Sequence, residues 1–205
     1  MAVVDNMQTA DALIGMPVLS RVTGNKLGEV HDLILDPVRG ELLGLWVRSP
    51  GGALDVMDYR EVYSFGRDAV MAAGDDSVIP SAETPLAEAP CVKRDVAGAR
   101  VVTEGGTLLG QVANVYVHLV WPPLVAYEVR ESLLDKVLGR GLFIPASVGR
   151  ALSHDAQRII VPEDAPRAAA ASLEELARGP MAVLIEDETV VRGRGRPELP
   201  EGPAS

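Results

Sequence analysis

The sequence predicts a mainly β protein of two tandem small antiparallel β-barrels, followed by a C-terminal helix and a short tail. Three observations lead to this fold class: an internal repeat, apolar residues at every second position, and turns rich in glycine, proline and asparagine. The two copies of the repeat run from Gly15 to Arg48 and from Gly98 to Arg130. Duplication of one small domain explains a repeat of this length.

Residues that recur at a nearly constant spacing define the repeat. Gly15 and Val18 recur 83 positions later as Gly98 and Val101. A shorter turn then reduces the spacing to 82, which relates Leu27, Gly28, Val30, Asp32, Leu42, Val47 and Arg48 to Leu109, Gly110, Val112, Asn114, Leu124, Val129 and Arg130. Because glycine tolerates tight reversals and close backbone approach, we expect structural roles for Gly15, Gly24, Gly28, Gly40, Gly98 and Gly110.

Between the turns, the apolar residues alternate as in strands that bury one face. The apolar face carries Leu33, Leu35, Leu43, Leu45 and Val47 in the first copy, and Val115, Val117, Leu119, Val125, Tyr127 and Val129 in the second. The opposite face carries Asp32, Trp46 and Arg48, and correspondingly Asn114, Glu128 and Arg130. One apolar face on a short, strongly turned sheet favours a rolled sheet or barrel.

The expected elements follow from these periods and from the turn residues. Turns are expected at Thr23–Lys26, Asp36–Gly40 and Trp121–Pro123. Strands are expected at about 16–22, 28–36, 41–48, 53–58 and 68–72, with a helical turn at 59–62, and then at 99–103, 110–120, 124–130, 141–145 and 157–161. A short helix is expected at 131–138.

The turn pattern resembles that of the PRC-barrel domain family. The residues that carry this resemblance are Gly15-x-x-Val18, Gly24-x-x-Leu27-Gly28-x-Val30-x-Asp32, and Gly40 before an apolar strand. The family is a small β-barrel named after the cytoplasmic domain of the photosynthetic reaction-centre H subunit, and it also occurs in a ribosome maturation factor. The motif consists of small and apolar residues, so the resemblance implies a fold and leaves the chemistry open.

The expected domain organisation has four parts. The first barrel covers 12–73, a linker with prolines and acidic residues covers 74–94, and the second barrel covers 95–162. The second copy departs from the family pattern by a shortened turn at 104–106 and an insertion at 131–141. Residues 163–205 are expected to form an alanine-rich helix at 166–178, an added strand or hairpin at 181–191, and a disordered tail.

Composition places the chain among globular proteins of a reducing compartment. It has 205 residues, 47% of them hydrophobic, and a single cysteine, Cys91, which excludes an internal disulfide. The first residues show no secretory signal and no apolar run reaches the length of a membrane span, so we expect a cytoplasmic protein. A formal net charge of −10 argues against direct nucleic-acid binding.

No chemical motif in the sequence is sufficient to predict an enzyme, a cofactor or a metal. His31, Asp32 and Asp36 are a conceivable metal site. The second copy argues against it, because Ala113 and Asn114 stand there at the positions of His31 and Asp32. His118 and His154 lack a nearby cluster, Ser147 lacks a nucleophile elbow, and Gly139-x-Gly141 lacks the third glycine of a dinucleotide loop. The Arg192–Arg196 segment is interpreted as part of the solvated tail, and contact with nucleic acid or an acidic partner is the alternative.

The sequence therefore predicts a non-catalytic protein-interaction or scaffolding module whose partner is another protein or a second copy. An exposed aromatic beside arginine marks interfaces, so the candidate partner surface is Trp46, Arg48 and the equivalent Arg130. Burial of Trp46 by the other barrel or the C-terminal helix is the competing interpretation. The rival functions are a ribosome or RNA maturation factor, an assembly factor at a membrane surface similar to the reaction-centre H subunit, and a hydrolase or metal enzyme.

Overall fold

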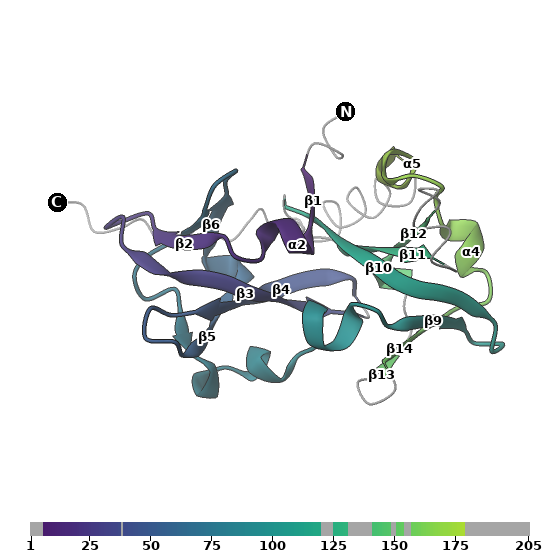
Figure 1. The fold of residues 1–205 in the computed structure, drawn as a ribbon, viewed down its shortest axis with the longest axis horizontal. Helices are drawn as coiled ribbons and strands as arrows, with labels where there is room; N and C mark the ends of the chain where they lie inside the picture. Colours follow the sequence, from purple (N-terminus) through teal and green to yellow (C-terminus); the bar gives the residue numbers. More distant parts are fainter. Residues whose placement is uncertain are drawn as a thin grey trace, which may run out of the picture.

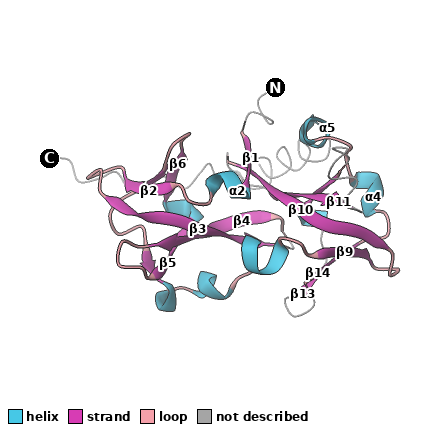
Figure 2. Ribbon diagram, in the orientation of Figure 1, coloured by secondary structure: helices cyan, strands magenta, loops and turns pink. Residues whose placement is uncertain are grey.

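Two seven-stranded sheets dominate the computed structural model, which describes residues 6–37, 39–119, 125–130, 141–148, 151–153 and 157–178. The sheets lie side by side along the long axis of the molecule, and the helices between them are short (Figure 1, Figure 2). The predicted mainly β fold is confirmed. Among the described residues, no helix is long and apolar enough to cross a membrane.

The two sheets have the same strand order. The first contains β6 (Val62–Phe65), β7 (Val70–Ala72), β2 (Pro17–Ser20), β3 (Lys26–Asp36), β4 (Glu41–Arg48), β5 (Leu54–Asp58) and β8 (Ile79–Pro80). The second contains β13 (Ala151–Ser153), β14 (Arg158–Val161), β9 (Arg100–Thr103), β10 (Leu108–His118), β11 (Val125–Arg130) and β12 (Leu142–Pro145), with β1 (Met7–Thr9) added to β10. Strands β2 to β7 of the first sheet therefore correspond, in chain order, to strands β9 to β14 of the second sheet.

One pair of strands in each sheet departs from the predicted all-antiparallel arrangement. Strand β7 runs parallel to β2, and β14 runs parallel to β9. Strands β2 to β7 with their connecting turns form one unit, and strands β9 to β14 form the other. The last two strands of a unit form a hairpin, β6–β7 or β13–β14, and the second strand of that hairpin pairs with the first strand of the same unit. Because the hairpin reverses the direction of the chain, the last strand runs parallel to the first strand. The pairing of the last strand with the first curls the sheet.

Both copies place irregularities at equivalent positions. Val18 pairs with Gly28 but Leu19 pairs with Lys26, which leaves Leu27 as an extra residue. Leu109 is the extra residue of the second copy, because Gly110 pairs with Val101 and Leu108 pairs with Val102. Such bulges bend a strand and increase its twist. The sequence repeat is thus reproduced in backbone geometry as well as in strand order.

A further bulge corrects one predicted core residue. Strand β4 was expected to bury Leu43, but Leu35 pairs with Leu42 and Ile34 pairs with Gly44. The extra residue Leu43 is half-buried, and Leu42 points into the core instead. Strict alternation fails here because a bulge shifts the side chains beyond it to the other face.

The glycines named from the sequence have two kinds of backbone requirement. Positive φ angles occur at Gly15 (91°), Gly24 (77°), Gly40 (69°), Gly98 (76°) and Gly110 (142°). Gly28 has a different constraint: a Cβ atom there would lie 2.4 Å from the carbonyl oxygen of Arg48 and 2.6 Å from Cγ1 of Val47. Strands β3 and β4 can therefore approach each other closely only because position 28 has no side chain.

Each unit is completed by the segment that precedes the other unit. Strand β1 pairs with β10, and the backbone N–H of Leu119 donates to the carbonyl of Asn6 at 3.0 Å. In the same way Cys91 forms a bridge to Ile34 on β3, and the N–H of Leu35 donates to the carbonyl of Pro90 at 2.8 Å. The two lead segments are thus exchanged between the sheets.

The helical turns that follow these lead segments are exchanged as well. Helix α2 (Ala10–Leu13) packs on β10, and the π-helical turn η4 (Val92–Val96) packs on β3. The hydroxyl of Thr9 caps α2 by accepting from the N–H of Ala12 at 3.2 Å. A four-residue helix has no stability of its own, so its position depends on this packing.

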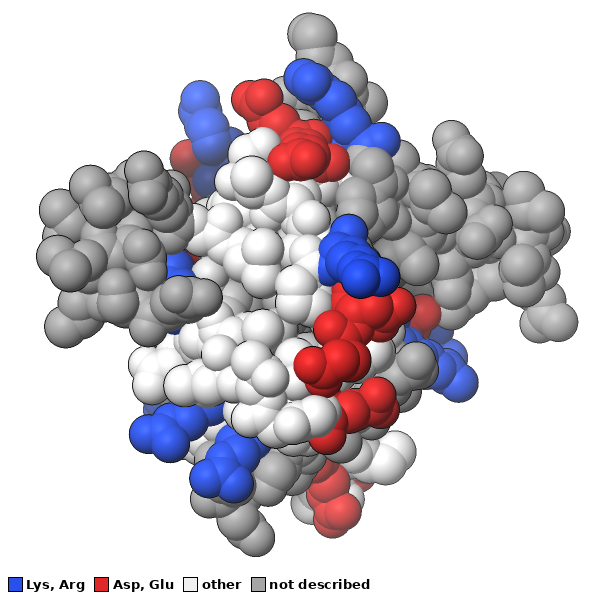
Figure 3. Space-filling view, turned by 90° about the vertical axis from the view of Figure 1, so that its right-hand side faces the viewer, with Lys and Arg blue, Asp and Glu red and all other residues white. Residues whose placement is uncertain are grey.

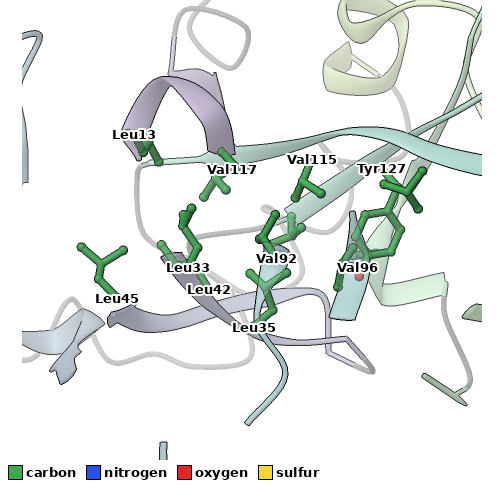
Figure 4. Close-up of a cluster of buried hydrophobic side chains, with 14 of the residues drawn as sticks. Leu13, Leu33, Leu35, Leu42, Leu45, Val92, Val96, Val115, Val117 and Tyr127 are labelled. Carbon is green, nitrogen blue, oxygen red and sulfur yellow. The ribbon is translucent and has the colours of Figure 1, made fainter. Parts of the chain in front are cut away.

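The larger of two hydrophobic clusters among the described residues runs through both units. Leu13, Leu33, Leu35, Leu42, Leu45, Val92, Val96, Val115, Val117 and Tyr127 lie in one cluster between the sheets (Figure 4). Hydrogen bonds also cross between the units: the N–H of Val125 donates to the carbonyl of Gly40, and the hydroxyl of Tyr59 donates to that of Leu119. The cores of the two sheets are therefore continuous.

The remaining described elements are short. The helical turn predicted at 59–62 is η1 (Tyr59–Glu61), and the linker region contains η2 (Ser81–Glu83) and η3 (Pro85–Glu88). A turn, η5 (Ala146–Val148), follows β12. The short strands β1, β6, β8 and β13 were not predicted, because two to four residues are too few for a periodic signal.

The helix predicted at 166–178 is divided in two, α4 (Ala165–Ala168) and α5 (Leu173–Arg178). Ala170 lies between them and exchanges two backbone hydrogen bonds with Phe143 of β12, each 2.9 Å long. Pairing with a sheet edge thus overrides the helix propensity of the alanines. The elements expected at 121–123, 131–138 and 181–191, and the tail, lie outside the described residues.

We expect the two sheets to unfold as one cooperative body. Leu13→Ala should cost about 2–5 kcal/mol, because it removes a fully buried side chain from the shared core. Hydrogen exchange measured by mass spectrometry should show protection falling in β3 and β10 together. Val22→Ala, at a position 68% exposed, is the control. Loss of protection in β10 alone would contradict the prediction.

Gly28→Val should destabilise the protein by about 1–3 kcal/mol or more, because the new side chain overlaps the backbone of β4. Urea denaturation followed by circular dichroism would measure the change. Gly51→Val is the matched control, since no atom lies within 4 Å of a Cβ at that position. Equal stability of the two variants would show that β3 and β4 can separate without cost.

Candidate functional site

An open groove lies between the first sheet and the turn that enters the second. It has a volume of about 410 Å³ and is lined by His31 and Asp32 of β3, Trp46 of β4, Leu54 of β5, and Cys91, Lys93 and Arg94. The last three residues belong to η4 and its N-cap, the teal turn beneath β4 in Figure 1. The groove therefore exists only because the lead segment of the second unit packs on the first sheet.

A bulge in β3 sets the direction of the side chains on the wall of the groove. Val30 pairs with Val47 and Asp32 pairs with Trp46, so His31 is the extra residue. His31 and Trp46 are both half-buried, whereas Asp32 is buried. An extra residue in one strand re-aims the neighbouring side chains, as is common beside binding sites.

Two carboxylates hold η4 in place. Asp32 accepts from the backbone N–H of Lys93, 3.1 Å from each carboxylate oxygen, and from the N–H of Leu33 at 2.8 Å. Asp95 accepts from the N–H of Cys91 at 2.7 Å and forms an ion pair with Arg94 at 3.0 Å. These buried carboxylates satisfy backbone donors of the turn, which has the rare i→i+5 geometry often found at functional sites.

The electrostatic field at His31 is positive. Burial lowers the pKa of its imidazole from the ordinary value of 6.5, and the charges of Arg48 and Lys93 lower it further, against a smaller opposing effect of Asp32. The guanidinium of Arg48 lies 3.2 Å from Nδ1 of His31, and Nζ of Lys93 donates to the carbonyl of His31 at 3.0 Å. Because arginine can only donate, the neutral imidazole accepts at Nδ1.

Cys91 is a buried thiol at the base of the groove. Burial, followed by the charge of Asp32, raises its pKa to about 12, against a smaller opposing effect of Arg94. The thiolate is the nucleophilic form of cysteine, so this side chain stays in its unreactive thiol form at neutral pH. Its role is to pair with Ile34 through the backbone and to pack beneath η4.

The equivalent place in the second unit is nearly closed. A cavity of only about 40 Å³ lies between α2 and β10, lined in part by Asn114. The position of Trp46 is occupied there by Glu128, which pairs with Asn114 across the bulge. Glu128 is buried, accepts from Asn114 at 2.5 Å and from the hydroxyl of Tyr116 at 3.3 Å, and forms an ion pair with Arg130.

The structure brings together two of the three predicted surface residues. Trp46 lines the groove, and Arg48 reaches it through His31. Arg130 belongs to the other sheet, where its side chain is 17% exposed and paired with Glu128. Trp46 is half-buried, and the turn before the second unit lines the same groove.

Sequence reasoning missed the side of the groove contributed by Cys91, Lys93 and Arg94. The available signal was a pair of cations at the end of a linker that is otherwise acidic. Of the residues considered for chemistry, Ser147 is half-buried against Gly40 and His118 is buried on β10, and His154 lies outside the described residues. Within the described ranges, no cluster of three His, Cys, Asp or Glu side chains could hold a metal ion.

The first sheet and its turns define a small curled β module of the barrel type. Residues 5–79 match the family model of the PRC-barrel domain, which confirms the predicted resemblance for this part of the chain. The match begins just before β1 and ends at β8, so it spans the whole first sheet. No curated protein matches the chain significantly.

The lowered pKa of His31 predicts a loss of stability on mild acidification. The unfolded chain takes up a proton near the ordinary pKa of 6.5 before the folded protein does, so stability should fall as the pH drops through 6.5. The thermal midpoint of the native protein should decrease more between about pH 7.5 and 5.5 than that of His31→Gln.

Nuclear magnetic resonance titration of His31 gives the direct measurement. Arg48→Ala should raise the pKa of His31, because it removes one of the two cations that repel the imidazolium. An unchanged pKa in this variant, or an equal loss of stability in His31→Gln and the native protein, would contradict the assignment.

Proposed function

We propose that this chain is a non-catalytic protein-interaction or scaffolding module built from two PRC-barrel units, 12–73 and 95–162, joined by the segment 74–94. The observation that carries the proposal is the groove beside Trp46, in which a half-buried aromatic and Leu54, 37% exposed, face an open space of about 410 Å³. Aromatic side chains next to arginine are characteristic of the energetic centres of protein interfaces.

The state of the titratable groups in the groove favours binding over catalysis. Asp32 is held by two backbone donors, and Cys91 is a protonated thiol. His31 accepts from Arg48, so its Nδ1 is occupied by a cation and is a poor general base. Each group therefore has a structural partner, and together they build a shaped surface of fixed charge.

The rival function in RNA or ribosome maturation has one supporting observation, the cluster of Arg48, Lys93 and Arg94. Arg94 is neutralised by Asp95, and the chain as a whole carries a net charge of −10. At the end of the molecule formed by the second sheet, an uncharged area is bordered by a row of acidic side chains (Figure 3). Affinity for nucleic acid comes mainly from many basic contacts to phosphates, which favours a protein partner here.

Affinity purification of the full chain from its own cells, with nuclease treatment, tests the function. We expect a protein partner that survives nuclease and is reduced at least about tenfold by Trp46→Ala. Tyr63→Ala is the matched control, because Tyr63 is an aromatic 42% exposed on β6, at the other edge of the same sheet.

Two outcomes would contradict the proposal. Recovery of ribosomal RNA or ribosomal proteins that disappears after nuclease would favour the maturation function. Equal recovery of the partner by both variants would place the binding surface away from the groove.

A further inference from the structure

We infer that the groove beside Trp46 binds an acidic segment of a partner protein, with an apolar side chain on Trp46 and Leu54 and carboxylates at Arg48 and Lys93. This inference rests on the proposed function and names the chemistry of the partner. It is carried by the charge of the groove, by its apolar wall, and by the contrast with the second copy.

The groove has positive charge that the described part of the chain does not neutralise. The side chains of Arg48 and Lys93 form no ion pair with a described carboxylate. Arg48 contacts Nδ1 of His31 and donates to the carbonyl of Gly52, and Lys93 donates to the carbonyl of His31. Asp32 lines the groove but is only 5% exposed, and both Asp32 and Asp95 accept from backbone N–H groups. The exposed charges here are therefore cations, among them Arg48 and Lys93.

The apolar part of the groove provides a place for a side chain of the ligand. Trp46 on β4 and Leu54 on β5 lie on neighbouring strands, since Arg48 pairs with Leu54 and Trp46 pairs with Val56. A volume of about 410 Å³ is within the range of pockets that bury a ligand group, about 300–1,000 Å³. Burial of one large apolar side chain would supply affinity, and the cations would supply orientation and selectivity.

The second unit acts as an internal comparison. It retains the fold and the arginine, but Glu128 replaces Trp46 and pairs with Arg130, and its small cavity is lined by Ala10 and Asp11 at the positions of Lys93 and Arg94. The second copy therefore differs from the first at the positions that give the groove its tryptophan and its cations. The fold itself therefore requires neither the tryptophan nor the free cations.

The number of cations favours a peptide over nucleic acid. Arg48 and Lys93, which form no ion pair within the described ranges, match two or three carboxylates of a short segment, whereas nucleic-acid binding gains its affinity from many released counterions. Among the other groups that line the groove, Trp46, Leu54 and Cys91 are apolar and suit a buried side chain of the ligand. An acidic peptide with one aromatic or leucine residue fits both parts.

Selection of random 12-residue peptides displayed on yeast, with the full-length protein as bait, tests the inference. Enriched peptides should carry net negative charge around an aromatic or leucine residue. Synthetic copies should bind in fluorescence anisotropy and lose at least about tenfold in affinity with Lys93→Glu, Arg48→Glu and Trp46→Ala. Lys26→Glu is the charge-matched control, because Lys26 is exposed on β3 and pairs only with Glu29 among the described residues. Arg48→Ala provides a second, milder variant, and thermal denaturation shows that each variant is folded.

Three results would overturn the inference. The first is that the native bait enriches no peptides relative to Trp46→Ala bait. The second is that the enriched peptides carry no excess of acidic residues. The third is that the synthetic peptides bind Lys93→Glu and Lys26→Glu equally well. Tighter binding of a single-stranded oligouridine than of any selected peptide would also overturn it in favour of RNA. If the cellular partner depends on Trp46 but not on Lys93, the proposed function stands and only the acidic chemistry is wrong.

Discussion

The exchange of lead segments between the two units is the constraint on which the rest of the structure depends. Each curled sheet leaves the middle of its long strand, β3 or β10, open on one side, and the segment that precedes the other unit covers it. Neither α2 nor η4 is long enough to be stable alone. Their burial joins the two hydrophobic cores into one, so each unit supplies a part that the other needs.

This exchange also explains why cavities of different volume lie at equivalent places in the two units. The turn that enters each unit crosses the long strand of the other at equivalent places, and each crossing creates a cavity. In the second unit Glu128 and Arg130 neutralise each other within the sheet. In the first, Trp46 stands at the position of Glu128 and Asp32 accepts from the backbone of η4, so Arg48 forms no ion pair with a described carboxylate and Trp46 faces the open groove. Small differences at a shared crossing therefore separate a closed site from an open one.

Much of the fold could be predicted because its signals are local. Alternation of apolar residues and the turn glycines gave β4 at its observed bounds and most of the other long strands to within two residues. The predictions failed where a distant partner decided the outcome. Leu43 is displaced by a bulge that β3 imposes, Ala170 leaves a helix to pair with Phe143, and β7 lies parallel to β2 because the sheet curls.

The sequence by itself determined the repeat, the alternation that places Trp46 and Arg48 on the face opposite the core, and the glycines that allow the turns. It could do so because turn chemistry and side-chain periodicity depend on neighbouring residues. Only the tertiary structure decided that Cys91, Lys93 and Arg94 line one groove together with Trp46, since this groove joins positions more than forty residues apart. It depends on a buried carboxylate, Asp32, whose partner is a backbone N–H on the far side of the linker, and no local pattern encodes that pairing.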